Sequence, residues 1–361
     1  MGFTESALRT FTEKHKWEKR KISVKLEDIL KKLCNLACVS GDEVEETGLF
    51  PLIEAYGEIR KDNLGNVIVK RNALNKPEFQ IVLDAHFDEV GMIVTNIAKE
   101  GFLKVASCGG LDPKVFFGAD VIVLGREKLP GVVCTIPPHL QPEGKGMWKL
   151  PDVTDICVDV GYNFEKATEL VPIGSKIVLK SRFLKLEGNI YSGRAMDNRA
   201  GCSALIYALE ELKDKKLQRT EVNVIFSAME EVGSKAYQCA VNSLNPTHVI
   251  VVDTTFGTSD GEDFKLAKLG KGPALGISPV LSCELKSKFE KLAKRESIPL
   301  QFEVMGGKTR TNADRFSISG KAMLISIPIK YMHSPVECVN LEDVKMTGQL
   351  IASFIENVEK A

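Results

Sequence analysis

Short apolar runs that resemble buried strands alternate with longer segments of helical periodicity across most of the 361-residue chain. Such runs suit strands that are buried on both faces, and the alternation is typical of an α/β sheet covered by helices. The predicted strands lie near residues 66–70, 79–83, 222–228, 248–252 and 322–327. The predicted helices lie near residues 26–33, 42–56, 199–213, 283–296 and 341–359. We therefore predict the α/β class, with a mixed sheet covered by helices on both faces.

Between residues 92 and 182 the pattern changes to short β-rich runs separated by Gly and Pro clusters, near 92–96, 102–106, 121–124, 132–135 and 176–179. This pattern is typical of a small all-β module. The predicted organisation is an N-terminal extension over residues 1–24, an α/β domain formed by residues 25–91 and 183–361, and a β-rich domain inserted over residues 92–182.

Charge and cysteine content narrow the class of protein. The 48 basic side chains equal the 48 acidic ones, which argues against a nucleic-acid binder because phosphate neutralisation needs a basic excess. No apolar run approaches the ~18 to 20 residues that span a bilayer, and the polar start of the chain does not resemble a secretory signal. The nine cysteines form no metal-binding or redox pairs with two-residue spacing. Scattered thiols indicate a reducing compartment, so we expect a cytoplasmic protein that binds neither nucleic acid nor membrane.

Acidic and histidine side chains follow four of the predicted strands, at the point where each strand ends. In open α/β sheets, sites form outside the carboxyl ends of the strands. We therefore expect these side chains to meet at one edge of the sheet. They are His86, Glu230, Glu231, Asp253 and His333.

A set of two imidazoles and several carboxylates suits Zn²⁺, Co²⁺ or Mn²⁺. Asp197 lies in the loop before the predicted helix near 199–213, where it can be shared between two ions. Each ion would then have three protein ligands and open positions for water and substrate. Two-metal sites of this kind, with ions ~3.5 to 4 Å apart, occur in hydrolases that include aminopeptidases. The candidate ligands are His86, Asp197, Glu231, Asp253 and His333.

Two further carboxylates are candidates for proton transfer and orientation. In the pair Glu230-Glu231, one side chain can bind metal while its neighbour takes a proton from water. Adjacent residues on a turn point in different directions, so this pair does not flank a glycosidic bond as a glycosidase pair would. Asp88 lies two residues after His86 and, on an extended chain, on the same side, where it can fix the imidazole tautomer.

Six motifs occur in a fixed order from about residue 25 to the C-terminus. They are Val39-Ser40-Gly41-Asp42-Glu43, Asp84-Ala85-His86-Phe87-Asp88-Glu89-Val90-Gly91, Ala195-Met196-Asp197-Asn198-Arg199-Ala200-Gly201, Glu230-Glu231-Val232-Gly233, Val252-Asp253 and Tyr331-Met332-His333-Ser334-Pro335-Val336-Glu337. Together they resemble the M42 family of metallo-aminopeptidases, which includes glutamyl and deblocking aminopeptidases and the tetrahedral TET peptidases.

The resemblance implies an enzyme that removes N-terminal residues from peptides with two divalent metal ions per subunit, Zn²⁺ or Co²⁺. It implies that His86 and Asp253 hold one ion, that Glu231 and His333 hold the other, and that Asp197 bridges them. Glu230 would take a proton from a water between the ions and deliver it to the leaving amine, and Asp88 would orient His86.

The resemblance also implies an assembly. The inserted domain over residues 92–182 would be a dimerisation domain, and residues 25–91 and 183–361 would form the catalytic metallopeptidase domain. In many family members dimers build a tetrahedral dodecamer, so we expect a homo-oligomer, a dimer or a dodecamer, whose partners are peptide substrates.

The chain departs from the family pattern at a few positions. Thr311-Asn312-Ala313 stands where many members have Thr-Asp-Ala, which affects a contact near the site but no metal ligand. Ser234 and Lys235 follow the Glu-Glu-Val-Gly motif in place of the usual residues. Lys308 and Arg310 are either solvated loop charges or groups that favour acidic N-terminal residues.

Two other functions remain open from the sequence. The same ligands would serve an acylase or deacetylase that acts on small amides, and a panel of aminoacyl and N-acyl substrates separates these activities. A catalytically silent relative that acts as a peptide-binding scaffold is the second alternative. The presence of all five ligands and of Glu230 argues against it.

Overall fold

The computed structural model describes residues 25–43, 48–134, 153, 156–258, 267–316 and 321–361, and twelve of the described strands form one large mixed sheet. These strands are β1 (Glu58–Lys61), β2 (Val67–Arg71), β3 (Phe79–His86), β10 (Leu184–Lys185), β11 (Ile190–Gly193), β12 (Thr220–Ser227), β13 (His248–Thr258), β14 (Ala267–Lys268), β15 (Ala274–Ile277), β16 (Gln301–Val304), β17 (Ala322–Lys330) and β18 (Glu337–Asn340). The main path runs β1-β2-β12-β3-β13-β17-β18-β11-β10, and β14, β15 and β16 join beside it.

The centre of this sheet consists of parallel strands. β12, β3, β13 and β17 lie side by side and run in the same direction, so their carboxyl ends meet at one edge. The register places Ser227 opposite His86 and Asp253 opposite Ser326. Chain segments that leave these four strands therefore start close together in space.

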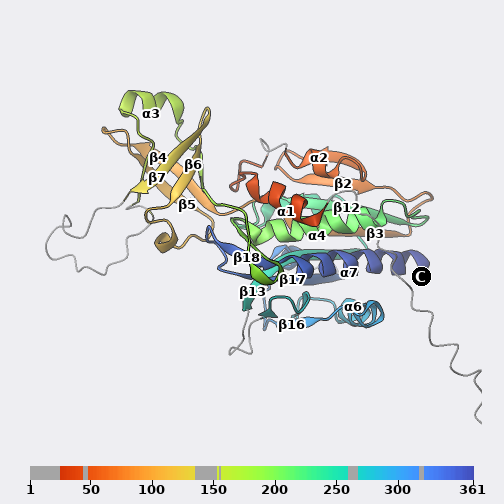
Figure 1. Cartoon of the computed structure of the whole chain (residues 1–361). Helices are drawn as coiled ribbons and strands as arrows, with labels where there is room; N and C mark the ends of the chain where they lie inside the picture. Colours follow the sequence, from red (N-terminus) through yellow and green to blue (C-terminus); the bar gives the residue numbers. More distant parts are fainter. Residues whose placement is uncertain (1–24, 44–47, 135–152, 154–155, 259–266, 317–320) are drawn as a thin grey trace, which may run out of the picture.

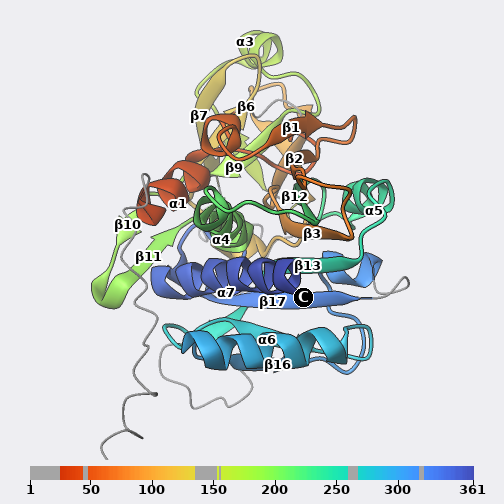
Figure 2. The same cartoon turned by 90° about the vertical axis from the view of Figure 1, so that its right-hand side faces the viewer.

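Helices cover both faces of the sheet. The α-helices of the described residues are α1 (Leu26–Asn35), α2 (Phe50–Ile53), α3 (Phe164–Leu170), α4 (Met196–Leu212), α5 (Lys235–Asn242), α6 (Cys283–Glu296) and α7 (Leu341–Lys360). α1, α4, α6 and α7 share the larger core on one face, and α5 packs on the other face with the 3-10 turn η5 (Asn312–Arg315). Figure 2 shows α7 lying along β17 between α4 and α6. None of the helices in the described part of the chain is both long and apolar enough to cross a membrane.

Side chains along each central strand point alternately to the two faces of the sheet, and this alternation decides on which face each site residue lies. On β3, Ile81 and Leu83 enter the larger core under α4 and α7, whereas Val82 enters the core under α5. Residues an even number of positions apart on a strand point to the same side. His86 therefore lies on the α5 side, with Asp84 and Val82.

A separate six-stranded barrel projects from one end of the large-sheet body (Figure 1). Its strands are β4 (Gly91–Ile97), β5 (Leu103–Cys108), β6 (Asp120–Leu124), β7 (Lys128–Cys134), β8 (Cys157–Asp159) and β9 (Lys176–Leu179). They close in the order β4-β5-β8-β7-β6-β9 around a core of their own, and α3 packs nearby. The short 3-10 turns η1 (Pro113–Val115) and η4 (Glu187–Asn189) lie in connections of the chain.

The predicted fold class is confirmed, and helix α6 has the predicted bounds. The helix predicted near 42–56 is wrong as a continuous element, because only Phe50–Ile53 is helical and residues 44–47 lie outside the described part. Glu43 is a turn residue, and its carboxylate accepts hydrogen bonds from the backbone N–H groups of Gly41 and Met229. Pro51, in the first turn of α2, suits a helix start. The predicted extension over residues 1–24 lies outside the described residues.

Candidate active site

Two groups of three side chains lie at the carboxyl edge of the parallel strands. One group is His86, Asp197 and Asp253, and the other is Asp197, Glu231 and His333. Within each group the potential ligand atoms all lie within 4.8 Å of one another. Asp197 belongs to both groups, so the five residues predicted as metal ligands are brought together around it.

The two oxygens of Asp197 face different histidines. Asp197 Oδ1 lies 3.2 Å from His86 Nε2, and Asp197 Oδ2 lies 3.4 Å from His333 Nε2. His86 Nε2 is also 3.6 Å from Asp253 Oδ1, and His333 Nε2 is 3.3 Å from Glu231 Oε1. The same five residues thus form two adjacent donor sets that share one carboxylate.

Each histidine presents Nε2 to these carboxylates because its other ring nitrogen has a partner. His86 Nδ1 lies 3.1 Å from the carbonyl oxygen of Asp88 and 3.5 Å from its carboxylate Oδ1. His333 Nδ1 lies 2.7 Å from the carbonyl oxygen of Gly110, a residue of the barrel segment. Backbone and carboxylate acceptors of this kind fix the tautomer and the ring orientation of metal-binding histidines.

Asp88 connects three parts of the site. Its carboxylate accepts hydrogen bonds from the backbone N–H groups of Glu230 at 3.0 Å and Glu231 at 3.2 Å, and from the hydroxyl of Ser40 at 2.6 Å. Asp88 is fully buried. The sequence predicted that Asp88 lies beside His86. The spacing of residues in the sequence did not predict its hydrogen bonds to the backbone of Glu230 and Glu231.

Met229 and His333 adopt left-handed backbone conformations at the site, and the N–H group of each donates to a carboxylate. Met229 has φ 57° and donates its N–H to Glu43 Oε1 at 2.8 Å. His333 has φ 62° and donates its N–H to Glu337 Oε1 at 2.6 Å. A left-handed conformation is costly for residues with a side chain, so these hydrogen bonds stabilise turns that aim Glu230, Glu231 and His333 at the site.

The donor sets fit divalent cations. Glu231 Oε1 is buried and makes no hydrogen bond, although His333 Nε2 lies 3.3 Å away, so this oxygen is open to a cation. Burial opposes protonation of His333, yet Asp197 and Glu231 raise its pKa to about 11. Because the cluster stabilises one added positive charge, it suits bound metal ions. Nitrogen and oxygen donors in sets of three suit Zn²⁺ or Co²⁺.

Glu230 lines the same cavity as the five candidate ligands but belongs to neither donor set. Burial, together with the negative charges of Asp253 and Glu231, raises the pKa of its carboxyl to about 9. Bound cations would lower this pKa, because they stabilise the ionised form. The position suits a proton acceptor beside the donor sets.

The cavity that contains the site has a volume of about 370 Å³. Beyond the donor sets its wall includes Phe256, Glu303 and Met305, and both Lys308 and Arg310 line it. Glu303 is held by the hydroxyl groups of Thr255 and Ser326 on β13 and β17.

Asn312, the departure from the Thr-Asp-Ala pattern, is buried behind the site. Its Nδ2 lies 2.8 Å from Asp84 Oδ2 and 2.8 Å from Ser227 Oγ. The amide therefore donates to a buried carboxylate on β3, two residues before His86. A carboxylate at position 312 would face the carboxylate of Asp84 instead.

Glu337 and Gly110 are site residues that the sequence analysis did not identify. Glu337 accepts hydrogen bonds from the backbone N–H groups of Asp197 and His333. A signal was present for Glu337, because it closes the motif that contains His333. Gly110 gave no signal, since it acts through its carbonyl oxygen and lies 223 positions from His333.

Known proteins share this fold and these motifs. A model of the M42 glutamyl aminopeptidase family matches residues 65–350. The lysyl aminopeptidase of Pyrococcus furiosus is 29% identical over 344 residues, which cover 92% of this chain and 97% of that protein.

Two solved structures are similar over nearly the whole chain. The TET aminopeptidase of a marine sediment Thaumarchaeota archaeon has a TM-score of 0.85 and 28% identity, and the match covers 93% of this chain and 98% of that one. The Pyrococcus horikoshii TET1 peptidase, which can assemble into a tetrahedron or a large octahedral shell, has a TM-score of 0.82 and 32% identity over 92% of this chain and 99% of its own. The chain therefore belongs to the M42 glutamyl aminopeptidase family and is an aminopeptidase, a hydrolase that acts at the N-termini of peptides.

Proposed function

We propose that this aminopeptidase works with two divalent metal ions, Zn²⁺ or Co²⁺, in the two donor sets. His86 and Asp253 would hold one ion, Glu231 and His333 the other, and Asp197 would contribute one oxygen to each. The observation that carries the proposal is the placement of Asp197, whose two carboxylate oxygens face the two histidines at 3.2 Å and 3.4 Å. When bound, such ions polarise the scissile carbonyl group and make water a stronger acid.

Glu230 is the general base of the proposed reaction. Its carboxylate lines the cavity beside the donor sets, takes a proton from the attacking water and delivers it to the leaving amine. Asp88 supports this step without touching the substrate, because it holds the backbone of Glu230 and Glu231 and the ring of His86. Selectivity for N-termini would come from docking of the free amino group at the ions or at a carboxylate of the cavity.

The substrates proposed are peptides with a free N-terminus, and the proposed assembly is a homo-oligomer. Residues 92–182 are proposed as the dimerisation domain and residues 25–91 and 183–361 as the catalytic domain. The separate core of the barrel and its projection from the large sheet support this division. The dodecamer named for the similar PhTET1-12s structure and the tetrahedron named for the TET1 peptidase support a dimer that builds a dodecamer. Mass photometry of the purified chain distinguishes the two states.

A cytoplasmic location is proposed for the enzyme. All nine cysteines are free thiols, although Cys134 and Cys157 lie on neighbouring strands. Free thiols are typical of compartments that keep cysteines reduced. Fractionation of cells that express the full-length chain tests the location.

The test of the mechanism compares metal content and hydrolysis of aminoacyl anilides for wild type, Glu230→Gln and Glu231→Gln. We expect about two ions per chain in wild type. In Glu230→Gln the metal should stay bound while kcat falls by about 10²- to 10⁴-fold. In Glu231→Gln the metal content itself should fall. Glu169→Gln, on the exposed surface of α3, is the matched control and should behave as wild type.

Other results would overturn the proposal. A wild-type chain without metal would mean that the donor sets have another role. Cleavage of N-acyl amides in preference to substrates with a free amino group would point to an acylase. Full activity in Glu230→Gln would exclude this residue as the base.

A further inference from the structure

Three side chains from three neighbouring strands of the barrel form a row. Lys104 on β5 lies directly opposite Cys157 on β8, and Cys157 lies directly opposite Cys134 on β7. Residues directly opposite each other on antiparallel strands point to the same side of a sheet and lie about 4.5 to 5.5 Å apart at Cα. Disulfides join residues whose Cα atoms are about 4.4 to 6.8 Å apart, so the spacing of Cys134 and Cys157 suits a bond between them.

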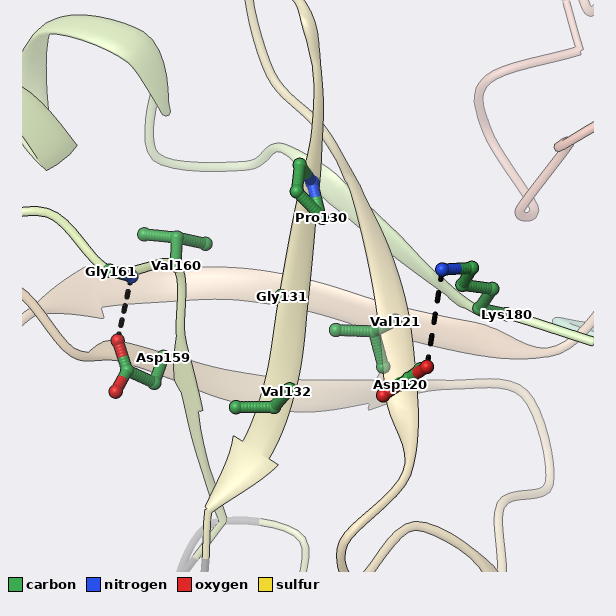
Figure 3. Close-up of a pocket in the computed structure, with 9 residues that line it drawn as sticks. All are labelled: Asp120, Val121, Pro130, Gly131, Val132, Asp159, Val160, Gly161 and Lys180. Carbon is green, nitrogen blue, oxygen red and sulfur yellow. Dashed lines mark hydrogen bonds and ion pairs between the residues drawn. The ribbon is translucent and has the colours of Figure 1, made fainter.

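The row lies on the outer side of the barrel. Val105, Val133 and Val158 are the sequence neighbours of the three residues and belong to the barrel core. Lys104 is exposed, and both cysteines are partly exposed. Figure 3 shows Val132 and Asp159, which lie opposite each other two positions further along the same ladder, and both line an outer hollow of about 340 Å³. A small thiol reagent can therefore approach the two sulfurs from solvent.

The contacts give the two thiols different roles. The ammonium group of Lys104 donates to Cys157 Sγ at 3.0 Å. The thiolate is the form of cysteine that attacks a disulfide, and a cation beside the sulfur stabilises that form. Cys134 Sγ donates instead to the carbonyl oxygen of Cys157 at 3.0 Å, and burial raises the pKa of the Cys134 thiol. Cys157 is thus the better attacking group and Cys134 the resolving partner.

No other cysteine has this combination of neighbours. All nine cysteines lie in the described part of the chain, and within it Cys134 and Cys157 are the only two that lie opposite each other on paired strands. Cys239 and Cys283 are exposed but lack a second thiol opposite them in a strand. Cys108 has Lys176 Nζ at 3.9 Å from its sulfur, without a cysteine partner.

We propose that Cys134 and Cys157 form a thiol-oxidation site on the barrel, which takes small-molecule disulfides such as oxidised glutathione and closes a reversible protein disulfide. The thiolate of Cys157 attacks one sulfur of the reagent, whose S–S bond breaks and releases one small thiolate. Cys134 then loses its proton and attacks Cys157 Sγ, which releases the second small thiolate. The two protein thiols lose two electrons and the reagent gains them, ending as two thiols.

The experiment treats the purified full-length enzyme with oxidised glutathione, blocks remaining thiols with N-ethylmaleimide and maps peptides without reduction. Before alkylation the intact product should be about 2 Da lighter than the reduced chain, because two thiol hydrogens are lost, and the unreduced digest should contain a peptide that links Cys134 to Cys157. Dithiothreitol should reverse the change. In Cys134→Ser the reaction should stop at a glutathione adduct on Cys157, since the resolving thiol is absent.

Lys104→Met tests the role of the ammonium group. It should slow the first step by about three- to tenfold and leave the final disulfide unchanged, because the thiolate loses its neighbouring cation. Lys176→Met, which removes the cation beside Cys108, is the matched control and should react at the wild-type rate. Adducts spread over Cys239 and Cys283 without a linked Cys134–Cys157 peptide would overturn the site. An unchanged rate in Lys104→Met would overturn the assigned role of Lys104.

Discussion

Glu337 accepts a hydrogen bond from the backbone N–H group of Asp197 at 3.1 Å, and thereby fixes the segment that carries the shared carboxylate of the active site. Its second oxygen accepts the N–H of His333 at 2.6 Å. Glu337 is buried at the start of β18, next to the end of β17. One carboxylate thus sets the relative position of two proposed metal ligands that lie far apart in sequence.

Glu337→Gln should weaken metal binding. The variant amide has only one oxygen, so one of the two N–H groups would face an NH₂ group. Loss of a carboxylate that supports metal ligands typically costs about 10- to 100-fold in affinity or activity. Metal titration by calorimetry and kcat/KM for one anilide measure the effect.

Glu342→Gln is the control for Glu337→Gln, because Glu342 lies nearby on the exposed side of α7, where it pairs with Lys345. Equal metal affinity in wild type and Glu337→Gln would show that the backbone of Asp197 and His333 holds its geometry without this carboxylate.

Asp88→Asn should lower kcat more than it lowers metal content. The neutral amide has one acceptor oxygen and an NH₂ group in place of the other, whereas the carboxylate uses both oxygens to accept from Glu230, Glu231 and Ser40. The turn that carries Glu230 would therefore lose part of its support. We expect a fall in kcat of about 10- to 100-fold. Ser40→Ala removes one of the same hydrogen bonds and should have a smaller effect on kcat. An Asp88→Asn enzyme as active as wild type would contradict this role.

The positions of the proposed ligands could be predicted because strand ends carry local signals. His86 and Asp253 end or interrupt apolar runs, and parallel strands bring such ends to one edge without further information. The Glu230-Glu231 pair also follows its strand directly. Predicting that these residues meet at one edge of the sheet required only the correct identification of the buried strands.

The supporting contacts could not be predicted, because they join distant segments through backbone groups. The carbonyl oxygen of Gly110 orients His333 across 223 positions, and no side chain signals it. The loop around Glu43 was predicted as helix, since its carboxylate bonds to the distant N–H of Met229 rather than within a helix. At Glu43 the tertiary hydrogen bond overrode the local helical pattern, whereas at Gly110 there was no local pattern to interpret.

Asn312→Asp should destabilise the protein, and Asp84→Asn should rescue it. The substitution places two carboxylates about a hydrogen-bond length apart in a buried site, where the amide now donates to Asp84 at 2.8 Å. We expect a loss of about 2 to 4 kcal/mol in the free energy of unfolding. The double variant exchanges the two groups and should recover most of the loss. Urea unfolding of all four proteins gives the coupling energy, and additive single effects would show that the two side chains do not interact.

His248 should make the protein less stable in mild acid. Its ring lies between Phe79, 6.2 Å away, and Phe354, 5.9 Å away, and only 5% of the residue is exposed. Burial, with help from the ammonium group of Lys321, lowers the pKa of His248 to about 4. The folded state therefore prefers the neutral ring, whereas the unfolded chain takes up a proton near pH 6.5.

Because the pKa is depressed in the folded state, the stability that His248 contributes is present above pH 6.5 and is lost as the pH falls towards 4. Linkage gives a loss of about 2 kcal/mol between pH 7 and pH 4.5. In His248→Phe the aromatic packing is kept but the titration is removed, so the fall in melting temperature between these pH values should be smaller than in wild type. Acidic groups elsewhere titrate equally in both proteins, and the difference between the two curves isolates His248. Parallel curves would mean that the ring takes up its proton with the same pKa in the folded protein as in the unfolded chain, which would contradict this prediction.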